Sequence, residues 1–134
     1  MRICAIDIHH HYVPNGLLEE CKKRGKQLGV ELIEKDGQKS LSFAGGPPFV
    51  FQADLSAVDE RLKMMQDYKL AMAALEAHTA TLGYRLTGEQ GENWCRTYNE
   101  GINDLIKRYP DRFVGMASVP LQDPTRAAKV LEDA

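Results

Sequence analysis

Sulfur-based chemistry has little support in this sequence. Its 134 residues include only three cysteines, Cys4, Cys21 and Cys95, and none of them forms a Cys-x-x-Cys pair of the kind that binds zinc or cycles between thiol and disulfide. An odd number of widely separated cysteines fits a reducing compartment better than a disulfide framework. We therefore expect a cytoplasmic protein.

Excess positive charge and long apolar stretches are also lacking. Seventeen basic and 19 acidic residues give a formal net charge of −2, which leaves no surplus of cations to neutralise a run of phosphates. The apolar start of the chain meets Asp7 and the histidines at 9–11 before a signal-length hydrophobic region can accumulate. No later run approaches the roughly 20 apolar residues that cross a bilayer. We expect neither a nucleic-acid partner nor a membrane partner.

The composition that remains suits one folded α/β unit. Hydrophobic residues make up 43% of the chain and charged residues 27%, a balance typical of soluble globular proteins. A chain of this length can bury roughly two thirds of its unfolded surface in a single core. We therefore expect residues 1–134 to form a single unit rather than several domains.

Short apolar segments alternate with segments of helical periodicity along the chain. The predicted strands are residues 3–8, 70–75 and 113–119. The predicted helices are residues 17–26, a segment that starts at Ser56, a segment from Thr87 to Tyr109, and a segment that starts at Asp123. The first strand is apolar on both faces, which is typical of a central strand covered by helices on both sides. The alternation predicts parallel βαβ units.

Local signals support several of these boundaries. Ser56 and Asp59 resemble a capping box, and Thr87 and Gln90 have the spacing of a complete one. The dipeptide Asp123-Pro124 supplies an N-cap followed by a first-turn proline.

Between the first two strands the pattern changes to that of a β-hairpin. Residues 30–33 and 41–43 flank Asp36-Gly37, a dipeptide that is favoured in tight hairpin turns. The segment 14–16, Pro-Asn-Gly, predicts a turn directly after the first strand. We expect a hairpin excursion over about residues 28–52.

Histidines cluster where the first predicted strand ends. Because strand side chains alternate, His9 and His11 share a face with their Cα atoms roughly 6.5–7 Å apart, so both imidazoles can reach one ion, whereas His10 points the other way. This spacing alone is weak support, since two histidines near a loop are often simply solvated. Their position at the C-terminal end of a buried strand, where parallel α/β folds build their sites, strengthens it. We predict that His9 and His11 bind a divalent transition metal, with zinc as the first choice and manganese or iron as alternatives.

Motifs in three parts of the chain resemble the amidohydrolase superfamily. Residues 6–14, Ile-Asp-Ile-His-His-His-Tyr-Val-Pro, are similar to its Asp-x-His-x-His opening followed by proline. Asn99 is followed by Tyr-Pro-Asp-Arg-Phe-Val-Gly at 109–115, and Val-Pro-Leu-Gln-Asp-Pro stands at 119–124, in the same order and spacing as in the family. More narrowly, the sequence is similar to the amidohydrolase-related group that contains aminocarboxymuconate-semialdehyde decarboxylase.

The resemblance implies a metal-dependent (β/α)₈ TIM barrel with a divalent metal at its C-terminal mouth, held by the first-strand histidines, a fifth-strand His and a last-strand Asp. Such a barrel needs about 250 residues, so residues 1–134 would be a single partial domain that contains its first three strand–helix units. The sequence would then be either a truncated piece of a longer protein or a fragmentary gene product. Catalytic residues are then expected in the missing C-terminal part. The segment 28–52 corresponds to a variable region that helps to cover the site in relatives, and Tyr68-Lys69 stands where the family often has glycine.

The activity that the resemblance implies is metal-dependent decarboxylation of an unsaturated or aromatic small-molecule carboxylate. Hydrolysis or hydration at the same metal, such as lactone opening, is the alternative enzyme class. A third alternative is a non-catalytic partial barrel that pairs with another copy through its open edge, as a homo-oligomer. We expect this chain alone to be inactive, because two histidines leave a catalytic zinc short of its usual three protein ligands.

Two further residues are candidates for roles around the metal. His78 follows the second strand on the same rim and is predicted to line the substrate, although a histidine at a strand exit is equally at home in solvent. Asp7 is predicted to orient a histidine or a backbone turn from behind the metal ligands, and an acid before a turn also has a purely structural explanation. Trp94 and Tyr98 are expected to pack their helix onto the sheet, and Asn99 to hydrogen-bond within the scaffold.

Overall fold

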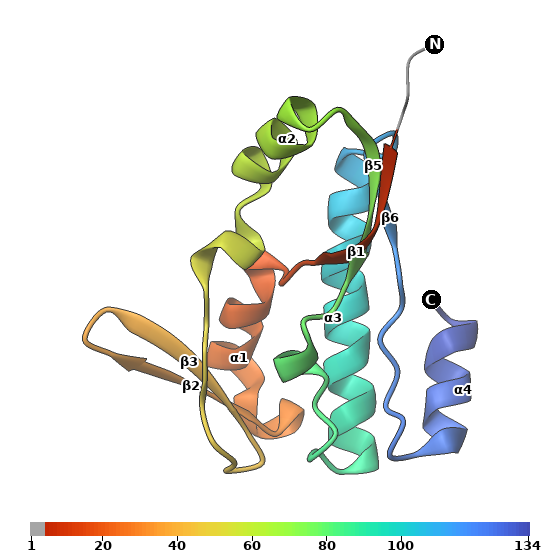
Figure 1. Cartoon of the computed structure of the whole chain (residues 1–134). Coiled ribbons are helices and arrows are strands. Elements are labelled where there is room, and N and C mark those ends of the chain that lie inside the picture. The colour runs from red at the N-terminus through yellow and green to blue at the C-terminus, as the bar shows by residue number, and fades with distance from the viewer. Residues whose placement is uncertain (1–4) are drawn as a thin grey trace.

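The computed structural model describes residues 5–134 and shows strands and helices in alternating order (Figure 1). The strands are β1 (Ala5–His11), β2 (Val30–Lys35), β3 (Gln38–Phe43), β4 (Phe49–Val50), β5 (Leu70–Glu76) and β6 (Phe113–Gly115). The α-helices are α1 (Asn15–Leu28), α2 (Val58–Asp67), α3 (Gly88–Arg108) and α4 (Pro124–Glu132), and two short 3₁₀-helices are η1 (Ala53–Ser56) and η2 (Thr79–Thr81). Residues 3 and 4 of the first predicted strand, and Cys4, lie outside the described residues.

The strands form two separate sheets. The order β1-β5-β6 makes a parallel sheet, which confirms the predicted βαβ units, and β2-β3-β4 makes an antiparallel sheet. Helix α3 runs along the parallel sheet, and α1 packs between α3 and the hairpin strand β2 (Figure 1). The chain therefore has an α/β core from which the hairpin sheet projects.

The first strand differs from its prediction in length and in burial. β1 continues to His11 instead of ending near Ile8, and its Ile6 and Ile8 are 57% and 76% exposed. It is an edge strand, because within residues 5–134 no other strand pairs with its outer side. The prediction of a central strand covered on both faces is therefore wrong for the described residues.

The predicted hairpin is confirmed, within the predicted residues 28–52, and a third short strand joins it. Asp36 and Gly37 adopt φ values of 51° and 77°, and Lys35 pairs with Gln38 across them. Positive φ at both central residues defines the type I′ turn, whose twist matches that of the flanking strands. The sequence did not predict β4, which pairs with β3 and places Phe49 opposite Leu41.

Two predicted helix signals act differently in the structure. Pro14 precedes the first residue of α1, so the segment 14–16 starts a helix instead of forming a turn. Ser56 does not cap α2: its hydroxyl donates a hydrogen bond to the carbonyl of Val13, and α2 begins at Val58 without a side-chain cap. The hydroxyl thus ties η1 to the segment that follows β1. α2 ends without glycine, because Lys69 itself adopts a φ of 57°.

Helix α3 follows its prediction closely. Thr87 and Gln90 form both hydrogen bonds of the capping box, and the helix ends at Arg108, before Pro110. Trp94 and Tyr98 are buried in the core, as predicted. The polar atoms of both side chains also form hydrogen bonds, which tie α3 to η2 and to the segment that follows β1. Trp94 Nε1 donates to the carbonyl of Thr81 at 2.7 Å, and Tyr98 Oη donates to the carbonyl of Tyr12 at 2.7 Å.

The third parallel strand is shorter than predicted. β6 ends at Gly115, whereas the sequence pattern continued to Val119. Farther along, the backbone of Ser118 bonds to a side chain instead of a strand: Asn99 Nδ2 donates to the carbonyl of Ser118 at 2.9 Å, and the N–H of Ser118 donates to Asn99 Oδ1 at 2.8 Å. The predicted scaffold role of Asn99 is confirmed. As predicted, Asp123 caps α4, accepting a hydrogen bond from the N–H of Arg126.

The core contains side chains from the parallel sheet, from the helices and from the hairpin. Its largest fully buried members include Trp94, Tyr12, Tyr98, Phe113 and Leu41. Cys21 and Cys95 are buried free thiols. Among the helices of residues 5–134, none combines the length and the apolar character needed to cross a bilayer.

Candidate metal centre

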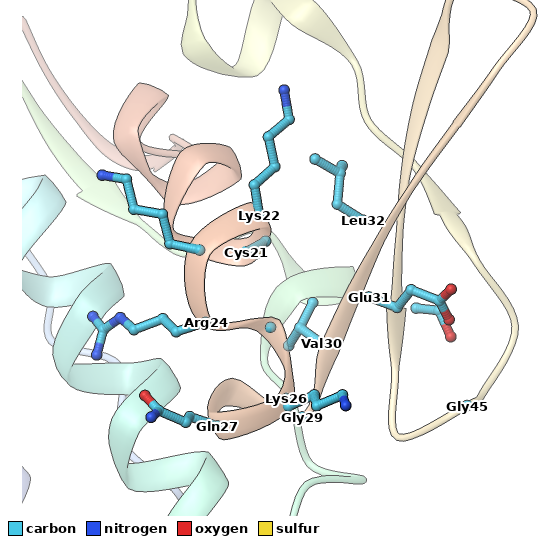
Figure 2. A pocket seen from close by; sticks show the side chains of 13 residues that line it. Cys21, Lys22, Arg24, Lys26, Gln27, Gly29, Val30, Glu31, Leu32 and Gly45 are labelled. Atoms are coloured by element: carbon cyan, nitrogen blue, oxygen red, sulfur yellow. The ribbon is translucent and has the colours of Figure 1, made fainter.

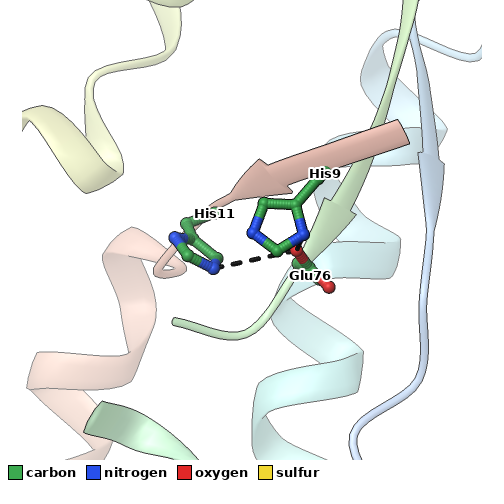
Figure 3. A group of neighbouring side chains, drawn as sticks. All are labelled: His9, His11 and Glu76. Carbon is green, nitrogen blue, oxygen red and sulfur yellow. Dashed lines mark ion pairs between the residues drawn. The ribbon is translucent and has the colours of Figure 1, made fainter. Parts of the chain in front are cut away.

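The pairing of β1 with β5 brings three potential metal ligands to one edge of the sheet. Parallel strands end at the same edge, and His11 stands opposite Glu76 in the register. His9, two residues earlier, also faces this point, so that one atom from each of His9, His11 and Glu76 lies within 4.8 Å of the others (Figure 3). The structure thus brings the predicted histidine pair together and adds a carboxylate.

The geometry of this cluster fits a divalent cation. Glu76 Oε1 lies 2.8 Å from His9 Nδ1 and 3.7 Å from His11 Nε2. This oxygen is shielded from solvent and forms no hydrogen bond, although the ring of His9 lies close to it. A buried carboxylate oxygen without a partner is energetically costly, and a cation would satisfy it. His9 is 71% exposed, which leaves the cluster open to an entering ion.

A β-bulge sets which side chains of β1 face the cluster. Asp7 pairs with Ala73 and His10 pairs with Leu75, so Ile8 and His9 together lie opposite one residue of β5. A bulge of this kind bends a strand and redirects its side chains. As a result Asp7 lies beside His10, with Oδ2 2.6 Å from His10 Nδ1, and not beside the ring of His9.

Asp7 nevertheless acts on the cluster through the backbone. Its Oδ1 accepts a hydrogen bond of 3.1 Å from the N–H of His9, in the bulge. Burial acts to raise the pKa of Asp7, but the hydrogen bonds from His10 and from the His9 N–H outweigh burial and hold this pKa below its usual value. Asp7 therefore carries a charge that holds the bulged backbone in place.

His78 lies on the same rim but is not one of the three convergent side chains. It precedes η2, where its Nδ1 accepts a hydrogen bond of 3.2 Å from the N–H of Ala80. Its ring lies edge-on to that of His11, with centroids 4.9 Å apart, and stacks on Phe49 at 5.1 Å. Burial, and secondarily the charge of His11, lower the pKa of His78.

Comparison with known proteins finds similarity of the chain to decarboxylases. No family model matches the chain. Over 77 residues it is 31% identical to the gamma-resorcylate decarboxylase of Rhodococcus jostii (strain RHA1), a match that covers 58% of this chain and 23% of the relative. The chain matches the N-terminal portion of amidohydrolase 2 family proteins.

Solved structures of this amidohydrolase group share the fold. Dihydroxybenzoic acid decarboxylase from Polaromonas sp. JS666, with bound manganese and the inhibitor 2-nitroresorcinol, superposes with a TM-score of 0.64 at 18% identity, over 96% of this chain and 34% of that protein. 4-Oxalomesaconate hydratase from Rhodopseudomonas palustris gives a TM-score of 0.63 at 24% identity, over 96% of this chain and 38% of that protein. The chain spans 23% of the curated relative and about a third of these structures. Its fold is that of the N-terminal third of the amidohydrolase TIM barrel, as predicted.

A cavity of about 660 Å³ opens beside the His9–His11–Glu76 cluster. It is lined by the three histidines of β1 and by residues of η1 and α2, among them Asp54 and Arg61. Arg61 is 8% exposed; its Nη2 donates to the carbonyls of Asp54 and Leu55, and its guanidinium lies over the ring of Tyr12. Burial lowers the pKa of this guanidinium. The cavity is large enough for a small ligand next to the cluster.

A second cavity, of about 740 Å³, lies between α1 and the hairpin (Figure 2), and none of His9, His11 and Glu76 lines it. Its basic lining residues include Lys22 and Arg24, which are paired with acidic groups: Lys22 Nζ lies 3.2 Å from Glu34, and Arg24 Nε lies 2.7 Å from Glu20. The local charges are largely balanced within the chain, so this cavity presents no strong attraction for an anion.

Sequence analysis missed two residues of the rim, for different reasons. Glu76 follows the predicted strand 70–75 directly, and the argument used for His9 also applies to a carboxylate at the C-terminal end of a parallel strand. The sequence signal was therefore present. Phe49 had no local signal, because it reaches His78 only through the pairing of β4 with β3.

Proposed function

We propose that this chain provides the first-strand part of the metal centre of a divalent-metal-dependent carboxy-lyase that acts on an aromatic or unsaturated carboxylate. The observation that carries the proposal is the convergence of His9, His11 and Glu76 around a buried carboxylate oxygen that has no hydrogen bond. The similarity to a gamma-resorcylate decarboxylase supports the choice of reaction.

The donor set favours a transition metal over magnesium or calcium. Imidazole nitrogen suits zinc, manganese and iron, whereas magnesium and calcium prefer oxygen ligands. Two histidines and one glutamate are a known ligand set of catalytic zinc, and two histidines with one carboxylate also suit iron. Zinc is our first choice, and the manganese named for the Polaromonas structure makes that ion the second to test.

In such a centre, some residues of the chain would bind the ion and one would hold a ligand in position. A divalent ion bound here would supply positive charge to stabilise the negative charge that develops as carbon dioxide leaves. His9 and His11 would hold it through neutral nitrogens, and Glu76 through a charged oxygen. Asp7 would keep His9 in place through the bulged backbone, since it binds the N–H of that residue.

Glu76 supplies a third potential metal ligand within this chain. The expectation of poor affinity counted only two histidines, whereas Glu76 completes a set of three protein ligands. We therefore propose that these 134 residues bind one divalent ion by themselves. Turnover without further residues is a separate question, and its expected absence stays a prediction.

The test combines metal content with a decarboxylation assay. The purified chain is loaded with zinc or manganese, dialysed and analysed for metal, and then incubated with 2,6-dihydroxybenzoate, the ligand named for a related decarboxylase structure, while carbon dioxide is measured. We expect about one ion per chain, and its loss on replacing both His9 and His11 by alanine. A wild-type chain that retains no metal would contradict the proposed centre.

Hydration is the second candidate, because the 4-oxalomesaconate hydratase structure shares this fold at 24% identity. The same metal-loaded protein is offered an unsaturated dicarboxylate and a lactone, and water addition or ring opening is followed by absorbance. Turnover of these compounds without release of carbon dioxide from 2,6-dihydroxybenzoate would favour the hydratase or hydrolase class over the lyase.

A further inference from the structure

A row of aromatic rings links the hairpin sheet to the metal centre. The ring of Phe49, in β4, stacks on His78 with centroids 5.1 Å apart and planes inclined by 22°. His78 in turn lies edge-on to His11 at 4.9 Å, and His11 edge-on to His9 at 4.8 Å. Phe49 therefore brings the hairpin sheet into contact with this row of rings.

The backbone around His78 restricts which of its nitrogens is free. Nδ1 accepts a hydrogen bond from the N–H of Ala80, and an acceptor nitrogen must present its lone pair. In a histidine with an unprotonated Nδ1, the proton resides on Nε2. The free nitrogen of His78 is thus a donor, with no lone pair to offer a metal ion.

The position of His78 is fixed from the main chain as well. Its carbonyl accepts two hydrogen bonds from Thr81, one from the N–H at 2.8 Å and one from the hydroxyl at 2.6 Å. The carbonyl of Thr81 accepts the indole N–H of buried Trp94. These bonds hold the backbone of His78 in place, so the orientation of its side chain depends mainly on rotation of the imidazole ring.

The stacking partner limits that rotation. Phe49 is itself held by the hairpin sheet, where it pairs with Leu41, and the N–H of Phe51, two residues later, donates to the carbonyl of Lys39 at 2.7 Å. A ring stacked on the imidazole favours an orientation of His78 that also keeps its T-shaped contact with His11. The hairpin sheet thus supports the orientation of a polar group at the site.

We propose that His78 contacts the ligand, with Nε2–H donating a hydrogen bond to a carboxylate or phenolate oxygen of an aromatic acid held at the His9–His11–Glu76 centre, and that Phe49 is the positioning residue that orients this donor. The identity of the ligand rests on the proposed function. The donor character of His78 and the role of Phe49 rest on the hydrogen bond and the stacking alone.

The first arm of the test needs no ligand. Chain labelled with ¹⁵N-histidine is observed by long-range ¹H–¹⁵N correlation before and after zinc is added. His78 should carry its proton on Nε2 in both states, while the nitrogens of His9 and His11 change on metal binding. A metal-induced change that converts Nε2 of His78 into a bound, unprotonated nitrogen would make it a ligand and overturn the proposal.

The same spectra test Phe49. A stacked aromatic ring shifts the protons of His78 by its ring current, so the shift should disappear in Phe49→Leu and persist in Phe49→Tyr. Phe51→Leu is the matched control, because it removes a nearby half-buried ring that does not stack on His78. Equal His78 shifts in wild type and Phe49→Leu would exclude the positioning role.

The second arm measures ligand binding. Manganese-loaded wild type, His78→Phe and His78→Gln are titrated calorimetrically with 2,6-dihydroxybenzoate. His78→Phe keeps an aromatic ring but no donor and should weaken binding about threefold to tenfold, the range expected for one lost hydrogen bond, while manganese affinity stays unchanged. His78→Gln, which retains a donor, should recover part of the loss.

The outcomes separate this inference from the proposed function. If wild type and His78→Phe bind the compound equally, the contact through His78 is wrong although the substrate class stands. If manganese-loaded wild type does not bind 2,6-dihydroxybenzoate at all, the proposed substrate class and the oxygen contact both fail, and the spectra still decide whether His78 is a donor held by Phe49.

Discussion

Replacing Glu76 by glutamine tests the metal centre most directly, because the change keeps the size of the side chain and removes its charge. In the metal-free chain Glu76 Oε1 makes no hydrogen bond, and its ion-pair contacts are with histidines, one of them 71% exposed, so the variant loses little and should unfold near the wild-type temperature. In the presence of metal the two proteins should differ strongly. The prediction is therefore a change in metal response rather than a general loss of stability.

The magnitude follows from the loss of one of three donors. Groups that only support metal ligands cost tenfold to hundredfold in affinity when removed, so loss of a direct ligand should cost about 100-fold, or about 2.7 kcal/mol. At a metal concentration of about 100 times the wild-type Kd, binding stabilises wild type by about 2.7 kcal/mol but Glu76→Gln by only about 0.4 kcal/mol. For a chain of this size, these values correspond to rises in Tm of about 8–13 °C and about 1–2 °C.

The assay is thermal unfolding with and without zinc or manganese, at one metal concentration for all proteins, with Kd measured separately by calorimetry. Glu34→Gln is the matched control, since it removes an exposed carboxylate that is paired with Lys22 far from the centre and should keep the full metal response. A metal-induced rise in Glu76→Gln as large as that of wild type would refute the assignment of Glu76 as a ligand.

Three further predictions concern the support of the site and the core. Asp7→Asn should lower metal affinity about tenfold by calorimetry, because a neutral amide holds the His9 N–H less strongly; unchanged affinity would count against the role of the bulge. Tyr98→Phe should lower the free energy of unfolding in urea by about 1–2 kcal/mol, since the Tyr12 carbonyl loses its buried donor; equal midpoints would contradict this. Burial raises the pKa of Cys95 from an ordinary 9.0 to about 12, so the neutral thiol favours the folded state. Its contribution should be complete below about pH 9 and fall as the pH rises toward 12, and Cys95→Ala should unfold with a weaker dependence on alkaline pH; identical pH profiles would contradict the shift.

Predictions from the sequence succeeded where neighbouring residues determine the geometry. The Thr87–Gln90 box and the Asp36-Gly37 turn depend on bonds and dihedral angles within four residues, and both have the predicted form. Ser56 had a similar local signal, but its hydroxyl binds the carbonyl of Val13, 43 positions away, because the tertiary structure offers a buried partner there. Local patterns thus fail where a distant group competes for the same atom.

The candidate site shows the same division. The histidine pair was predicted from strand alternation, yet β1 contains a bulge between Asp7 and His10, so simple alternation does not describe its side chains. Glu76 could have been predicted, because polar side chains at the C-terminal ends of parallel strands gather at one edge of the sheet. It was missed because the predicted strand ended at residue 75, one residue before the end of β5. Phe49 was out of reach, since its contact with His78 depends on the hairpin folding back toward the rim.

The sequence by itself determined the α/β alternation, the hairpin, the capped helices and the histidines at the end of the first strand, because hydrophobic periodicity and turn chemistry act over a few residues. Only the tertiary structure decided that β1 is an exposed edge strand, that Asp7 faces His10, and that Glu76 joins His9 and His11. These features depend on the register between β1 and β5, which are some 60 residues apart in the chain. Register is set by which faces of paired strands are buried together, a property of the assembled sheet rather than of either segment.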